Sequence, residues 1–292
     1  MNYINQKKVI KRMSGRIFLN RVFKVIFLLA TLFALATLGI LIYRMISQGA
    51  GHLTVDFLSN FSSRFPDKAG IKAALVGSIW LMIVVAPVSL ILGVGAALYL
   101  EEYAPKNKMT DFIKMNISNL AGVPSVVFGL LGLTIFVRSL GLGKSVLAAG
   151  LTMSLLILPV IIVSSQEAIR AVQSELREAS YGMGATKWQT ILKVVLPSAL
   201  PGILTGCILA LSRAVGETAP LVVLGIPVIV HFLPAGLLSE FTALPMQIYD
   251  WAKRPQAEFQ NVAAAGILVL LVFLIVLNSI AIFIRNKFQK RY

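Results

Sequence analysis

Residues 178–197 read EASYGMGATKWQTILKVVLP and separate two long apolar parts of the chain. Over residues 165–184, apolar side chains recur every three or four positions, a spacing that predicts an amphipathic helix. Gly182 and Gly184 permit a sharp turn, and a second short helix then runs to Pro197, which is expected to stop it. We therefore expect two short helices joined by a turn that faces water. The expected apolar face of the second helix consists of Trp188, Ile191, Leu192 and Val195.

The composition indicates what surrounds the rest of the chain. Of the 292 residues, 57% are hydrophobic and 13% are charged, whereas a soluble domain carries about 25% charged residues. This excludes a cytosolic enzyme and predicts an integral membrane protein. The single cysteine, Cys207, excludes an intrachain disulfide, a thiolate zinc site and an iron–sulfur cluster. The net charge of +15 indicates basic loops that hold membrane spans on the cytoplasmic side, rather than nucleic-acid binding.

Six regions are apolar enough to be membrane spans, because crossing ~30 Å of hydrocarbon takes about 20 residues. One of them, Val194–Ser239, is interrupted by Arg213 and Glu217. It is either one span near Ser198–Gly225 followed by an irregular apolar loop, or two spans with the charges in a turn. The five uninterrupted spans are predicted at Val25–Tyr43, Ala73–Leu100, Met115–Val137, Ser145–Gln166 and Phe259–Ile284.

Loop charges favour six spans over seven. With the amino terminus inside, six spans place most loop lysines and arginines in the cytoplasm, whereas seven would export the basic tail. The first span could instead be a secretory signal, but its apolar run is too long and Tyr43-Arg44-Met45 is a poor cleavage site. The predicted division is 1–24, a basic cytoplasmic amino terminus; 25–43, the first transmembrane helix; 44–72, an external loop; 73–284, a core of five spans with a cytoplasmic loop at 165–197 and an external loop at 226–258; and 285–292, a cytoplasmic tail.

Arg213 and Glu217 are the charges inside the fifth predicted span. Each costs about 2.5–3.5 kcal/mol at mid-membrane even on the gentler insertion scale. Four positions apart on a helix, they would share a face and pair, so one reading is an internal ion pair that locks the bundle. The other is a permanent positive charge beside a translocation path, suited to an oxyanion such as phosphate or sulfate, with Glu217 tempering it.

The loop at 165–197 also resembles a known signature, the EAA motif of ABC-importer permeases (E-A-A-x3-G-x9-I-x-L-P). Ser180 replaces the second alanine and Val194 the isoleucine. In that family this loop is the coupling helix, which sits in a cleft of a separate ATP-binding subunit. The chain has no phosphate-binding loop of its own for ATP. The residues that the resemblance assigns to coupling are Glu178, Ala179, Ser180, Gly184, Trp188, Val194, Leu196 and Pro197.

Three further stretches resemble the PstA family, which supplies one membrane subunit of phosphate-specific ABC importers. They are RAVGETAP at 213–220, FTALPMQIY at 241–249 and AGVPSVVFGL at 121–130. The resemblance implies the MetI-like permease fold, the bacterial inner membrane, and a substrate path along Arg213 and Glu217. It also implies partners: a PstC-like permease, two PstB-like ATP-binding subunits that would carry ATP and Mg²⁺, and an external PstS-like phosphate-binding protein. No cofactor or metal is expected on this chain.

Alternatives remain at this level. The sister PstC-type subunit shares RAxGET but typically continues Met-Ala, so Thr218-Ala219-Pro220 favours the PstA type. A permease for sulfate, molybdate or phosphonate is the nearest rival, and an ATP-independent channel or secondary transporter belongs to a different class. An intramembrane hydrolase is disfavoured because no histidine lies in a clearly predicted span and no G-x-S-x-G or H-E-x-x-H motif is present.

Overall fold

The computed structural model describes residues 6–288 and is built from helices; within these residues the only β pairing is an isolated bridge between Ser145 and Glu240. The outermost parts of the predicted basic terminus and tail, 1–5 and 289–292, lie outside the described residues. The α-helices are α1 Gln6–Gly49, α2 Val55–Ser59, α3 Lys72–Leu98, α4 Lys108–Leu120, α5 Ser125–Gly132, α6 Val146–Arg170, α7 Ser174–Gly182, α8 Lys187–Thr190, α9 Leu196–Gly216, α10 Ala219–Leu224, α11 Leu244–Lys253 and α12 Ala257–Phe288. Three π-helical segments extend them, namely η3 Tyr99–Tyr103, η4 Leu133–Ser139 and η5 Ile191–Val195, and short 3-10 turns occupy Ala50–His52 and Pro66–Lys68.

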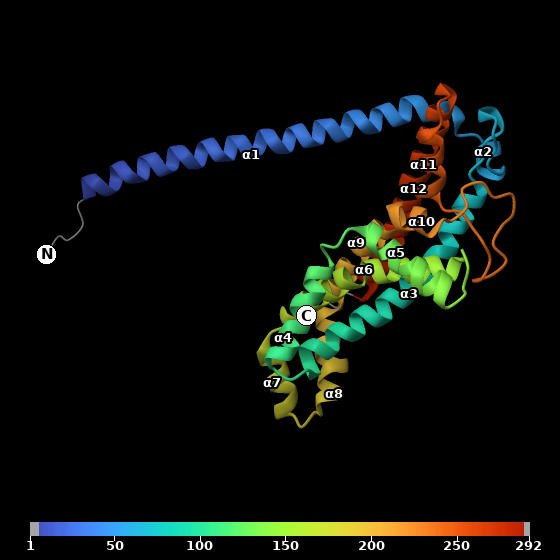
Figure 1. Ribbon diagram of the computed structural model, residues 1–292. Helices are drawn as coiled ribbons and strands as arrows, with labels where there is room; N and C mark the ends of the chain where they lie inside the picture. The colour runs from blue at the N-terminus through green and yellow to red at the C-terminus, as the bar shows by residue number, and fades with distance from the viewer. Residues whose placement is uncertain (1–5, 289–292) are drawn as a thin grey trace.

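The core helices run between two opposite ends of the molecule (Figure 1). The α11 end gathers the C-terminus of α1 and the N-termini of α3, α6 and α12. The loop 226–243 contacts it through the bridge from Glu240 to Ser145, and Leu244 N at the start of α11 donates a 2.8 Å hydrogen bond to Ser78 Oγ on α3. The α7 end gathers the C-termini of α3 and α6 together with α4, α7 and α8. The chain therefore passes five times between the two ends, through α3, the α4–α5 region, α6, α9 and α12, and α1 is the sixth candidate span.

The first helix stands apart from this core. In Figure 1, α1 projects away from the other helices, and only its C-terminal part lies beside α12. With 44 residues it is far longer than the span predicted at 25–43; at 1.5 Å per residue it measures about 66 Å, roughly twice the hydrocarbon thickness. None of its most apolar 18-residue window is buried within the described residues. Lipid or another chain must cover this surface.

Helix α6 is the centre of the core, packed between α3 and α9. Met153 and Ile161 on α6 are completely buried. On α9, Gly202 and Gly206 form a G-x-x-x-G pair that lets the two helices approach closely: a Cβ added at Gly202 would lie 2.8 Å from the Cβ of Ala168. The motif therefore allows close packing of α6 and α9.

The third predicted span is not one straight helix. The chain bends by 102° between α4 and the α5–η4 segment, at residues 121–124. Pro124 precedes the first turn of α5, and a residue before proline avoids helical geometry, which explains the break. The segment Ser125–Ser139 alone carries the chain toward the α11 end; its 15 residues measure about 22 Å as an α-helix, less than the hydrocarbon thickness. Within residues 6–288, five helices, or six spans with this bent pair, are long and apolar enough to cross a membrane.

The region after Pro197 resolves the choice between one span and two. A continuous helix runs from Lys187 to Gly216, and a short α10 and an irregular loop follow. This is the one-span alternative. The prediction that Pro197 stops the second short helix is wrong, because the π-helical turn η5 directly precedes it, widens the helix and accommodates the ring at the start of α9.

Candidate functional site

The EAA-like loop, defined here as residues 165–197, is a helical hairpin at the α7 end. The amphipathic helix predicted over 165–184 is divided: α6 ends at Arg170, and α7 begins at Ser174 after a short break. Gly184 has a φ of +82°, a left-handed conformation that other residues rarely adopt, and it makes the turn toward α8. A capping box between Thr186 and Gln189 then starts α8.

The hairpin presents an exposed tip and a groove. The tip carries Met183, whose side chain is 90% exposed, and Trp188, which is 59% exposed. The expected apolar face of the second helix is therefore divided: Ile191 and Val195 are buried, whereas Trp188 and Leu192 face outward. A groove of about 800 Å³ lies between the two arms. Its lining includes four of the predicted coupling residues, Ala179, Ser180, Gly184 and Val194.

The remaining predicted coupling residues lie around this groove. Glu178 is exposed, and Leu196 and Pro197 are half-buried where α9 begins. Ser180 Oγ is 2.9 Å from Thr190 Oγ1, a hydrogen bond that joins the two arms. The predicted set is thus brought together on one surface element, with small side chains in the groove and large ones at the rim.

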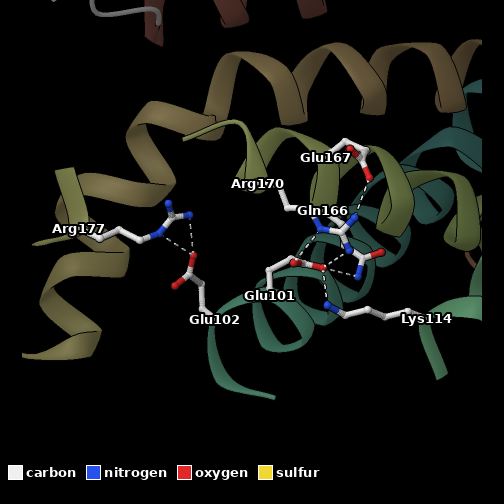
Figure 2. Close-up of polar contacts among 7 residues, drawn as sticks. All are labelled: Glu101, Glu102, Lys114, Gln166, Glu167, Arg170 and Arg177. Atoms are coloured by element: carbon white, nitrogen blue, oxygen red, sulfur yellow. Dashed lines mark hydrogen bonds and ion pairs between the residues drawn. The ribbon is translucent and has the colours of Figure 1, made fainter. Parts of the chain in front are cut away.

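Beside the loop lies a polar cluster that the sequence analysis did not predict (Figure 2). It is centred on Glu101 and Glu102, adjacent residues in the π-helical end of α3, whose side chains are 10% and 8% exposed. Glu101 accepts hydrogen bonds from Arg170 and Gln166 on α6 and pairs with Lys114 on α4. Glu102 pairs with Arg177 on α7. The partners on α6 and α7 lie 65–75 positions away in the sequence and therefore leave no local signal there.

The second candidate site is the break between α9 and α10. Arg213 lies in the last turn of α9, and Glu217 follows the helix end with extended backbone (φ −79°, ψ 121°). The expectation that they share one helical face is therefore wrong, although the expected ion pair is present as a long contact. Their closest atoms, Arg213 Nε and Glu217 Oε2, are 4.0 Å apart, and Arg213 donates no side-chain hydrogen bond within residues 6–288. The guanidinium is half exposed.

Packing fixes the position of this break. Helix α10 lies against α5, where Gly129 provides the space: an added Cβ would come within 2.9 Å of the Cα of Pro220. Gly225 then ends α10 in a left-handed conformation. The stretches 121–130 and 213–220, singled out separately in the sequence, therefore meet in the structure. Within residues 6–288, no three His, Cys, Asp or Glu side chains lie close enough together to hold a metal ion.

Known proteins similar to this chain are transport permeases. "Probable ABC transporter permease protein YqgI" of Bacillus subtilis is 37% identical over 66% of each chain. "Phosphate transport system permease protein PstA 1" of Mycobacterium tuberculosis (strain CDC 1551) is 37% identical over 76% of this chain and 72% of its own. The PstA of Yersinia pestis is 31% identical over 92% of this chain and 91% of its own.

Solved structures and a family model agree on the fold. A chain of the inward-facing MetNI methionine ABC transporter superposes with a TM-score of 0.61 at 18% identity, covering 75% of this chain and 96% of that one. A chain of a bacterial ABC transporter that imports alginate superposes with a TM-score of 0.63 at 14% identity, covering 96% of this chain and 100% of that one. The family model "Binding-protein-dependent transport system inner membrane component" matches residues 89–292. The chain belongs to this family of multi-pass inner-membrane ABC permease components.

Proposed function

We propose that this chain is one permease subunit of an ATP-driven importer that moves inorganic phosphate into the cytoplasm by alternating access. The observation that carries the proposal is the half-exposed guanidinium of Arg213 beside the break at Glu217. A half-exposed cation inside an otherwise apolar span, with its nearest carboxylate oxygen 4.0 Å away, is costly and points to a functional role such as a path for an anion. The PstA relatives from Mycobacterium tuberculosis and Yersinia pestis, named for phosphate transport, are 37% and 31% identical to this chain over 76% and 92% of its length.

The substrate pathway is proposed at Arg213 and Glu217. The planar guanidinium can donate two parallel hydrogen bonds to an oxyanion, which a lysine ammonium cannot do. At 4.0 Å, Glu217 lowers the positive field without occupying the fork. We infer that this balance lets the anion bind weakly enough to leave, as a transport path requires.

The coupling role is proposed for the EAA-like loop. Its exposed tip, with Met183 and Trp188, and its turn at Gly184 form a compact protrusion that a partner subunit can bind. ATP and Mg²⁺ would bind a separate PstB-like ATPase, present in two copies. A PstC-like permease would form the other half of the pathway, and a PstS-like binding protein would deliver phosphate at the α11 end.

The proposed orientation places the α7 end and both termini in the cytoplasm. This follows the distribution of lysine and arginine among the loops. ATP binding would close the ATPase around the loop and swing the helices outward-open, and hydrolysis would return them. The loop 226–243 and α11 would then face the binding protein outside.

Reconstituted transport tests the proposal. The complex of this chain with its second permease, ATPase and binding protein is placed in liposomes, and uptake of labelled phosphate is measured with and without ATP. Unlabelled phosphate should suppress uptake, whereas sulfate, molybdate and phosphonate should not. Uptake of another oxyanion in place of phosphate would refute the substrate, and uptake without ATP would refute the coupled importer.

A further inference from the structure

The end of α3 is fastened to the EAA-like loop by two adjacent carboxylates. Consecutive residues of a helix point in directions about 100° apart, so Glu101 and Glu102 can face different neighbours. Glu101 faces α6 and α4: Arg170 donates from Nε and Nη2, both at 2.9 Å, and Lys114 Nζ lies at 2.9 Å. Glu102 faces α7 (Figure 2). Two neighbouring positions of α3 therefore hold three other helices.

Arg177 joins α7 of the EAA-like loop to the core helices. It lies on α7 and donates to Glu102 Oε1 from Nη2 at 3.0 Å and from Nε at 3.3 Å. The same guanidinium donates to the carbonyl oxygens of Ile169 at 2.9 Å and Val172 at 2.6 Å. These carbonyls lie at and just beyond the C-terminal end of α6, where helix carbonyls lack intrahelical partners. One side chain thus fixes α7 to α3 and α6 together.

The arrangement suits transmission of movement better than surface stabilisation. Both carboxylates are at least nine-tenths covered, whereas the Arg170–Glu167 pair within α6 is exposed and joins nothing to a second element. Planar guanidinium groups with several bonds resist reorientation more than flexible ammonium groups do. The backbone between α6 and α7, in contrast, is a short non-helical break that could act as a hinge.

We propose that Glu102 and Arg177 are positioning residues of the transport cycle, with Glu101 and Arg170 as the supporting pair: they close the hinge between α6 and α7, so that displacement of the loop by the ATPase moves α3 and α6 as one body. This inference rests on the proposed coupling role of the loop. Without the fastening, α7 pivots at residues 171–173, and ATP hydrolysis proceeds without opening the path.

The test is the amount of phosphate taken up per ATP hydrolysed by the reconstituted complex, after ATPase binding has been verified by co-purification. Glu102→Gln should keep the ATPase bound and active while the ratio falls about fivefold or more, the lower range of allosteric coupling. Arg177→Lys keeps the charge but loses the bonds to both carbonyls, so a smaller fall is expected. Glu167→Gln, which removes the exposed pair within α6, should keep the wild-type ratio.

A double variant separates positioning from stability. Replacing both partners, Glu102→Met with Arg177→Met, leaves no unpaired buried charge and restores folding if stability was the only loss. A positioning role predicts that the ratio stays low in this folded protein. A wild-type ratio in Glu102→Gln, or recovery of the ratio in the double variant, would overturn the proposal; if Glu102→Gln cannot be isolated, Arg177→Lys and the double variant decide. Should the wild type carry another oxyanion, only the phosphate proposal fails, and the ratio is measured for that ion.

Discussion

At the scale of single residues, the two proposed sites differ in how their charged side chains are paired and covered. The substrate site has an exposed, loosely paired charge, whereas the cluster beside the EAA-like loop has covered and closely paired charges. Arg213 is half exposed and 4.0 Å from its nearest carboxylate oxygen, a separation too long for a hydrogen bond. Glu101 and Glu102 are almost covered and have close partners. The first arrangement leaves donors available to an anion, and the second holds helices together.

Replacing Arg213 by glutamine should reduce phosphate uptake by about tenfold or more, because charge-assisted bonds to an oxyanion are about twice as strong as neutral ones. The uptake rate of Arg213→Lys should lie between those of the wild type and Arg213→Gln, since lysine keeps the charge and loses the planar fork. Initial uptake rates in liposomes measure this, with Arg138→Gln, at an exposed arginine near the α11 end, as the matched control. High-affinity uptake retained in Arg213→Gln would exclude a role in the pathway.

Replacing Gly184 by alanine should weaken coupling, because its φ of +82° costs a residue with a Cβ about 1–2 kcal/mol. No atom lies within 4 Å of the added Cβ, so strain rather than a clash is tested. Gly182→Ala is the control, since that glycine is also in open space but has no positive φ. The readout is stimulation of ATP hydrolysis by phosphate-loaded binding protein; equal stimulation in both variants would contradict the assignment.

At the scale of elements, the helices depend on close approach along α6. Gly202 faces Ala168 there, and substitution by valine should destabilise the protein by about 1–3 kcal/mol through overpacking. Gly95→Ala on α3 meets no atom within 4 Å and should be neutral or slightly stabilising. Thermal unfolding of the detergent-solubilised protein compares the two, and identical transitions would show that α6 and α9 are not in tight contact.

What the sequence could predict is what depends on local spacing. The apolar runs predicted the spans, and the motif from Glu178 to Pro197 predicted the loop. Hydrophobic periodicity and turn residues act over a few positions and can therefore be recognised in the sequence. The break at Glu217 was missed because an i,i+4 spacing indicates a shared face only if the helix continues. The cluster at Glu101 and Glu102 was not predicted, since their partners become neighbours only once α3, α4, α6 and α7 are packed. Pro197 was misread because the π turn before it has no sequence signature.

At the scale of the whole molecule, the single span Lys187–Gly216 requires the tip at Met183 and the loop 226–243 to lie on opposite sides of the membrane. Met183 and Leu238 are both exposed, at 90% and 67%, so a cysteine at either position should react with a membrane-impermeant maleimide from one side only. The native Cys207 is buried and should stay unlabelled in the wild-type control.

Labelling should reach Met183→Cys only in inside-out vesicles and Leu238→Cys only in intact cells stripped of their outer layers. The reason is that one helix, Lys187–Gly216, with the short α10, separates the two positions. If both cysteines reacted from the same side, residues 194–239 would cross the membrane twice, and Arg213 and Glu217 would lie in a turn between two spans. Opposite sides in the reverse sense would preserve the fold and place the EAA-like loop outside, away from ATP, which would refute its proposed coupling role.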